Sequence, residues 1–87
     1  MKTFYLLWTN RNDTLNNQAT AFCGGYTTFE NAGKEMQRIF AQELIPYLDS
    51  VHDLSQLDFE KSELRMYVAF DDDYFEINIT EILIQDI

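Results

Sequence analysis

A hydrophobic stripe of helical period occupies the middle of the chain. Its members recur at intervals of three and four residues, as on one face of an α-helix. They are Phe29, Ala32, Met36, Ile39, Phe40, Leu44, Tyr47 and Leu48. Most of the positions between them are polar or charged, so one face of the helix should pack against other elements while the opposite face meets water. The pattern predicts a single long amphipathic helix.

Both ends of this helix have sequence signals. Thr27 and Glu30 have the spacing of a capping box, in which each side chain satisfies a backbone amide of the first turn. Pro46 lacks an amide hydrogen and crowds the preceding turn. We therefore expect the helix to start after Thr27 and to end or kink near Leu44 or Ile45.

Two strands are predicted before the helix. Residues 3–9 are aromatic and aliphatic over strand length, and residues 10–13 after them have the composition of a turn. A polar loop through residues 16–18 leads to a second strand at residues 19–23. The glycine pair at residues 24–25 is expected to turn the chain into the helix.

A β-hairpin is predicted after the helix. Residues 49–60 have a loose pattern, which indicates a connecting loop with a helical turn near residues 50–56. Regular alternation then returns, with Leu64, Met66, Val68 and Phe70 on one face and Arg65, Tyr67 and Ala69 on the other. An acidic turn at residues 71–73 leads into a strand at residues 74–79.

The alternation changes phase after Ile79. Phe75 and Ile77 share parity with Ile79, whereas Ile82 and Ile84 have the opposite parity. A flat strand cannot keep both sets on one face, so we expect either a bulge at residues 80–81 or a break into a separate terminal strand.

The fold class that follows is α+β, with one compact domain over residues 1–87. Its elements have the order β-β-α-β-β, or the same order with a fifth strand at the C-terminus. The strands form a small antiparallel sheet, and the long helix packs on one face of it. In the first strand Phe4, Leu6 and Trp8 point to one side and Tyr5 and Leu7 to the other. We expect apolar residues on the face without the helix: Tyr5, Leu7, Tyr67 and Ala69. Such a surface is unusual when solvated, which suggests a partner or a second copy of the chain.

Candidates for chemistry are few. His52 lacks a recognisable nucleophile, and Cys23 has no basic neighbour in sequence to activate its thiol. The acidic turn and Glu76 lack the alternating ligands and central glycine of a calcium loop. We therefore expect no enzyme, cofactor or metal site, and interpret Cys23 as a buried structural thiol and His52 as a surface loop residue.

Charge is distributed unevenly. Of fifteen carboxylates, twelve lie from Glu43 onwards against only Lys61 and Arg65, giving that part about −10 while residues 1–42 carry about +1. A concentrated negative field repels nucleic acid and anionic lipid and attracts basic proteins. The chain has a single cysteine and shows neither a leader-like N-terminus nor a long apolar run, so we expect a reduced cytoplasmic protein. We expect no direct binding to nucleic acid or to membranes.

The leading hypothesis is that acidic side chains and nearby tyrosines bind the basic cleft of a nuclease or other nucleic-acid-handling effector. The candidate contact residues are Asp58, Glu60, Glu63, Tyr67, Asp71, Asp72, Asp73, Tyr74 and Glu76. In size and charge the chain resembles the small acidic inhibitors that phages and mobile elements direct against host nucleases, including anti-CRISPR and anti-restriction proteins. That resemblance implies inhibition by occlusion.

A different class of function is also consistent with the sequence. A sheet that is apolar on both faces would suit a structural or oligomerisation module that forms a homodimer through the sheet, with charge serving only solubility. The two hypotheses differ in which residues matter: the acidic turn in the first, and the sheet face in the second.

Overall fold

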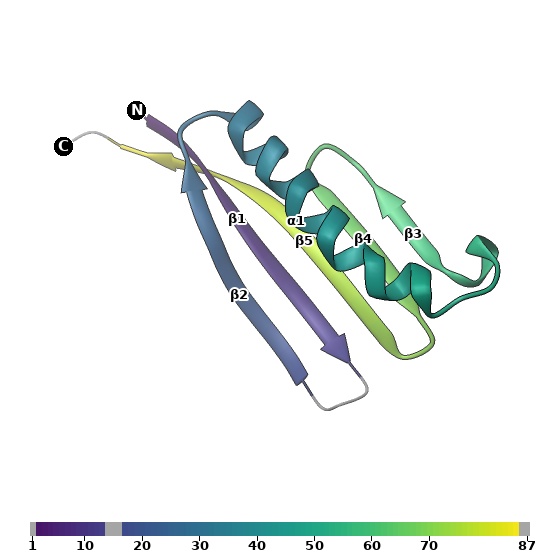
Figure 1. Ribbon diagram of the computed structural model, residues 1–87. Helices are drawn as coiled ribbons and strands as arrows, with labels where there is room; N and C mark the ends of the chain where they lie inside the picture. Colours follow the sequence, from purple (N-terminus) through teal and green to yellow (C-terminus); the bar gives the residue numbers. More distant parts are fainter. Residues whose placement is uncertain (1, 14–16, 86–87) are drawn as a thin grey trace.

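The computed structural model describes residues 2–13 and 17–85 and shows one antiparallel five-stranded sheet with a helix packed on one face (Figure 1). The elements are β1 (Lys2–Asp13), β2 (Asn17–Tyr26), α1 (Phe29–Asp49), a 3₁₀ turn (Leu54–Gln56), β3 (Asp58–Lys61), β4 (Arg65–Phe70) and β5 (Asp73–Ile84). Their order in the sheet is β2-β1-β5-β4-β3. The α+β class and the predicted β-β-α-β-β order are confirmed. The additional strand is β3, which comes between α1 and β4 along the chain, and not a separate strand at the C-terminal end.

The core lies between α1 and one sheet face. Leu7, Val68 and Ile77 are fully buried there, and Met36 and Phe40 reach them from the helix. The predicted helical stripe supplies this layer, although its last member, Leu48, is exposed. In the described segments, no helix is long and apolar enough to cross a membrane.

The helix begins one residue later than expected. Thr28, not Thr27, is the N-cap, and its hydroxyl accepts a hydrogen bond from the Asn31 amide at 3.2 Å. The predicted capping box at Thr27 and Glu30 is therefore wrong. Two threonines in succession offer the same cap chemistry, so composition alone cannot choose between them.

The helix also continues through Pro46 to Asp49, so the predicted end near Leu44 or Ile45 is wrong. Tyr47 lies beyond the proline and packs against the core, which favours continuation of the helix. At the C-cap, the Ser50 hydroxyl donates to the Pro46 carbonyl at 2.8 Å.

The first two strands are longer than predicted. The expected turn at residues 10–13 belongs to β1, and the expected turn at residues 24–25 belongs to β2. Of the predicted polar loop at residues 16–18, Asn17 and Gln18 lie in β2 and Asn16 lies outside the described residues. A register shift between Leu7 and Trp8 leaves Cys23 as the extra residue of a bulge. Gly24 serves close packing, because a Cβ there would lie 3.2 Å from the Tyr26 hydroxyl.

β5 runs unbroken, so neither the predicted bulge nor the predicted break at residues 80–81 occurs. Ile79 pairs with Leu7, and Ile82 pairs with Phe4, without a register shift between them. Ile82 and Ile84 therefore lie on the face away from the helix, where the parity of a flat strand places them.

The assignment of Tyr5 and Leu7 to the uncovered face is also wrong. Tyr5 packs edge-on against Phe29 of the helix, with ring centroids 5.7 Å apart, and Leu7 is at the centre of the core. Both parities of β1 are apolar, so its sequence does not reveal which one faces the helix. Tyr67 and Ala69 do lie on the uncovered face, because their register partners Glu76 and Tyr74 have the opposite parity to Phe75 and Ile77.

The β4–β5 hairpin is confirmed, and its turn contains a strained residue. Asp71 has φ 58°, in the left-handed region, and is the non-glycine residue with positive φ in the described chain. Glycine adopts this conformation without the steric cost of a Cβ. We expect Asp71→Gly to raise the free energy of unfolding by up to about 1 kcal/mol in chemical denaturation.

The adjacent turn residue supplies the control for this change. Asp72→Gly removes the same charge at a position without positive φ, so it should leave stability unchanged or lower it. Equal stabilisation by both variants would show that charge repulsion, rather than backbone strain, governs the turn.

Candidate protein-interaction face

The side of the sheet that α1 does not cover is called the open face here. Its members follow from strand alternation and register, and they fall into two halves along the strands. The half near the β4–β5 turn carries Asp58, Glu60, Arg65, Tyr67, Ala69, Tyr74, Glu76, Asn10 and Asn12. The other half carries Phe4, Leu6, Trp8, Phe22, Ile82 and Ile84.

Five of the nine predicted contact residues come together in the first half. Glu60 pairs across the sheet with Tyr67, and Tyr67 pairs with Glu76, so these three side chains form one row over β3, β4 and β5. Asp58 and Tyr74 flank Ala69 in the next row. The rings of Tyr67 and Tyr74 lie 6.1 Å apart at an interplanar angle of 31°. The face thus combines carboxylates with adjacent aromatic rings.

Arg65 sits among these carboxylates; strand alternation predicted that it shares a face with Tyr67 and Ala69, but not that it pairs with Glu60 and Glu76. Its guanidinium donates to Glu76 Oε2 at 2.6 Å, contacts Glu60, and lies 4.7 Å from the centre of the Tyr67 ring. Partial burial opposes its charged form, but hydrogen bonds and charges from Glu76 and Glu60 prevail and raise the pKa of Arg65. The charges of Glu60 and Glu76, two of the five predicted contact residues on this face, are therefore partly neutralised. The signal was available, because Arg65 has the parity of Tyr67 on β4.

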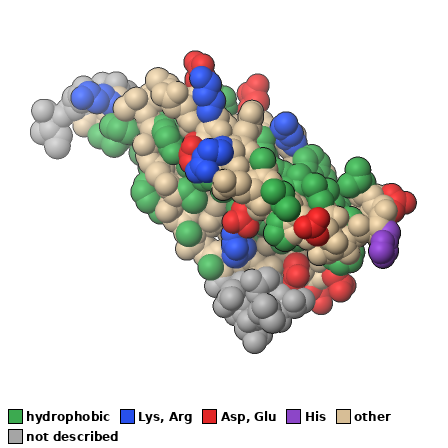
Figure 2. All heavy atoms as spheres, in the orientation of Figure 1, with side chains coloured by type: hydrophobic (Ala, Val, Ile, Leu, Met, Phe, Trp, Pro, Cys, Tyr) green, Lys and Arg blue, Asp and Glu red, His purple; other side chains and the backbone are tan. Residues whose placement is uncertain are grey.

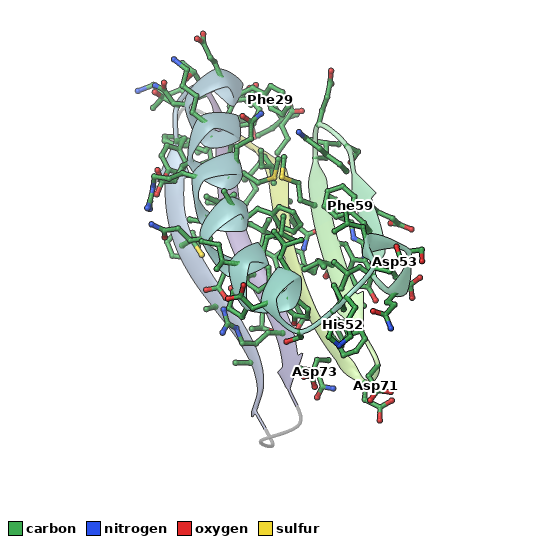
Figure 3. All side chains as sticks on the ribbon, turned by 45° about the vertical axis from the view of Figure 1, so that its right-hand side comes forward. Phe29, His52, Asp53, Phe59, Asp71 and Asp73 are labelled. Atoms are coloured by element: carbon green, nitrogen blue, oxygen red, sulfur yellow. The ribbon has the colours of Figure 1, made fainter. Side chains whose placement is uncertain are left out.

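The other four predicted residues do not join this row. Asp71 and Asp72 are exposed at the β4–β5 turn, with Asp71 at its tip (Figure 3). Glu63 is exposed in the β3–β4 connection, at the opposite end of β4. Asp73 has the parity of Phe75 and therefore lies on the helix-covered side. Of the predicted acidic turn, Asp73 thus lies on the helix-covered side, whereas Asp71 and Asp72 lie in the turn itself, outside the sheet.

A small cavity lies beside Asp73, between β1, β5 and the C-terminal half of α1. Its volume is about 210 Å³, and Phe70, Phe75 and Pro46 supply apolar walls. Arg11 spans it by pairing with Glu43 at 2.9 Å. The Asp73 Oδ1 atom is buried and accepts no hydrogen bond within the described chain. The cavity is partly open to solvent and has both polar and apolar walls.

Groups capable of catalysis are dispersed. Cys23 is exposed on the edge strand β2, so its interpretation as a buried structural thiol is wrong, and His52 is exposed in the loop after α1, as predicted (Figure 3). Over residues 2–13 and 17–85, no group of three or more histidine, cysteine or acidic side chains is arranged to hold a metal ion.

The second half of the open face is apolar. Phe4, Leu6 and Trp8 are half-buried, whereas Phe22 is 67% and Ile84 46% exposed. The Trp8 indole donates to the Thr80 hydroxyl at 2.9 Å, which fixes its ring on the surface. Sequence reasoning missed this patch because it assigned the isoleucines at the end of β5 to the core.

The helix-covered side has a different character. Basic and acidic side chains interleave there, and hydrophobic side chains gather between α1 and β3 (Figure 2). Phe59 of β3 is 51% exposed, and its ring packs edge-on against Phe40 with centroids 5.7 Å apart. Ion pairs such as Lys34–Glu30, at 3.3 Å, neutralise part of the charge along the helix. The helix still has four acidic residues against two basic ones, so it carries a share of the negative surplus.

Comparisons with protein-family models, with curated proteins and with solved structures found no match to this chain.

Proposed function

We propose that this chain is a non-catalytic inhibitory protein that occludes the nucleic-acid-binding surface of a basic protein, such as a nuclease or other nucleic-acid-handling effector. The observation that carries the proposal is the row of Glu60, Tyr67 and Glu76, with Asp58 and Tyr74 beside it, on a sheet face that none of the described elements covers.

Charge supports this choice of partner. The chain carries −9 at neutral pH, and Asp71 and Asp72 extend the negative surface beyond the end of the open face. A negative field of this kind speeds encounter with Lys- and Arg-rich proteins and repels nucleic acid itself. The basic groove of a nucleic-acid-binding protein has the complementary charge.

Side-chain type supports it as well. Tyrosine, tryptophan and arginine are the residues that most often dominate binding energy at protein interfaces. The open face presents Tyr67 and Tyr74 beside Arg65, with Trp8 further along the sheet. Arg65 pairs with two carboxylates and stacks on Tyr67, so these groups are held in place before a partner arrives. Carboxylates would select the partner, and the aromatic rings would supply packing.

Partner capture followed by quantitative binding tests the proposal. The purified chain is used to capture proteins from lysates of its source or host at low salt, and the captured protein is purified and titrated by calorimetry. We expect a basic nucleic-acid-binding protein, with affinity that weakens as salt increases and with competition from DNA or RNA. Failure to capture a protein of this class, or simultaneous binding of chain and nucleic acid, would contradict occlusion.

Charge reversal locates the contact. Asp58→Lys on the open face is expected to weaken the captured partner's binding at least about tenfold, because it places a cation against a basic surface. Glu30→Lys makes the same charge change at an exposed position on the helix, and its effect should stay below about threefold. Equal effects of the two variants would mean that net charge alone drives binding, which would exclude the open face as the specific contact.

A further inference from the structure

The two edges of the sheet differ sharply in charge and length. β2 forms one edge with ten residues, and none of them is charged. β3 forms the other edge with four residues, of which Asp58, Glu60 and Lys61 are charged. Short, charged edges are a common protection against pairing with another chain, whereas a long uncharged edge leaves its outer backbone groups open to a further strand.

The uncharged character extends beyond β2. No acidic or basic residue occurs between Asp13 and Glu30, although 24% of the chain is charged. The residues of β2 from Ala19 to Cys23 are exposed, and Phe22 is 67% exposed on the open face. Within the described sheet, no other strand lies beyond β2 to pair with its outer side.

We propose that β2 is a homodimerisation edge, at which a second copy of this chain adds its own β2 in antiparallel register about a two-fold axis. Antiparallel pairing of one strand with itself is isologous, so each copy supplies the same surface and the contact closes at two chains. The geometry is that of strand addition to an exposed sheet edge.

Charge favours a second copy over a basic partner at this edge. Two chains of −9 repel each other unless their acidic surfaces are kept apart, and pairing through β2 places β3, β4 and the acidic turn at the far ends of the assembly. A basic partner would gain nothing from an uncharged strand and would prefer the opposite end of the sheet. The uncharged edge is thus suited to pairing with a second copy of this chain, which the acidic parts of the surface would repel.

The bulge at Cys23 sets the extent of pairing. It interrupts the regular strand, so the flat part of the edge runs from Asn17 to Phe22. Six residues a side make a small interface, for which we expect a dissociation constant of about 1–100 μM. Phe22 lies at the end of this flat part, where it would pack across the interface on the open-face side.

Such a dimer would have ten strands in one continuous sheet. A two-fold axis perpendicular to the sheet keeps both helices on one side and both open faces on the other. The proposed partner-binding rows would then face the same direction from the two ends. This inference stands apart from the proposed function, because the chain can pair through β2 whether or not its open face binds an inhibited protein.

Sedimentation equilibrium of the intact chain, from about 1 to 500 μM, tests the dimer directly. We expect a reversible monomer–dimer equilibrium in the stated range. In parallel, amide hydrogen exchange should slow with concentration at those β2 amides that point away from β1. A chain that stays monomeric over the whole concentration range would overturn the proposal. So would a dimer in which the outer β2 amides exchange equally fast at the lowest and the highest concentration.

Three variants, each adding one negative charge, separate this edge from other contacts. Phe22→Glu should weaken the dimer at least about tenfold, because it replaces an apolar side chain that packs across the interface with a charge that would have to be desolvated there. Leu64→Glu, at a residue 53% exposed near the far edge of the sheet, should change it less than about threefold. Ile84→Glu tests the apolar half of the open face. Loss of the dimer with Ile84→Glu but not with Phe22→Glu would overturn edge pairing in favour of a face-to-face dimer.

Discussion

Replacing Ile77 by alanine is expected to lower the free energy of unfolding by about 2–5 kcal/mol. Ile77 is fully buried between β1, β4 and the helix, at the centre of a core that also contains Leu7 and Val68. The lost methyl groups remove transfer free energy and leave a cavity that a close-packed core fills only in part. For a domain of this size, total stability is on the order of 5–15 kcal/mol, so this single change removes a large share of it.

The measurement is urea unfolding at low protein concentration, followed by far-UV circular dichroism and by the fluorescence of Trp8, the single tryptophan. Ile82→Ala is the matched control, because it makes the same change on the same strand but on the open face, where the side chain is only half-buried. Its expected cost is about 1 kcal/mol or less. Equal losses for the two variants would contradict a core confined to the helix-covered side.

The order of elements could be predicted from local pattern, because each element has its own period. The stripe that includes Met36 and Phe40 has helical spacing, and the residues from Leu64 to Phe70 alternate strictly. Both patterns describe one element against its own neighbours. Register between strands is a different kind of information, since it depends on contacts between residues far apart in sequence.

This difference explains the misplaced residues of β1 and β5. Tyr5 and Leu7 have the parity of one face and Phe4, Leu6 and Trp8 that of the other, and all five are apolar. Hydrophobicity alone therefore cannot say which set the helix covers. The bulge predicted near Thr80 rested on the assumption that every isoleucine of β5 belongs to one core, whereas the structure has a second apolar surface on the open face.

The candidate site was predictable in part for the same reason. Tyr67, Tyr74 and Glu76 lie on a hairpin whose alternation fixes their shared face, so the pattern could bring them together. β3 has only four residues, mostly charged, and such a segment gives little strand signal. The places of Glu60 in the row and of Asp58 in the next one, and the pairing of Arg65 with Glu60, depended on that unpredicted strand.

A second large effect is expected from Pro46→Ala, which should raise the free energy of unfolding by about 1–3 kcal/mol. Proline in a helix interior removes one backbone hydrogen bond and crowds the preceding turn, yet α1 passes through Pro46 and continues to Asp49. Alanine restores a donor for the carbonyl of Gln42 and has the highest helix propensity. The gain is reduced because proline also restricts the unfolded chain.

Chemical denaturation with unchanged m-value checks this result. Gln42→Ala, at an exposed position one turn earlier on the same helix, is the control and should change stability by less than about 0.5 kcal/mol. A loss of stability in Pro46→Ala would mean that the proline ring contributes more through its contacts beside Tyr47 and Phe75, where it lines the cavity, than it costs the helix. A gain in the free energy of unfolding would show that Pro46 costs α1 a backbone hydrogen bond and that core packing by Tyr47 compensates for this cost. A loss would show that the proline ring itself stabilises the fold.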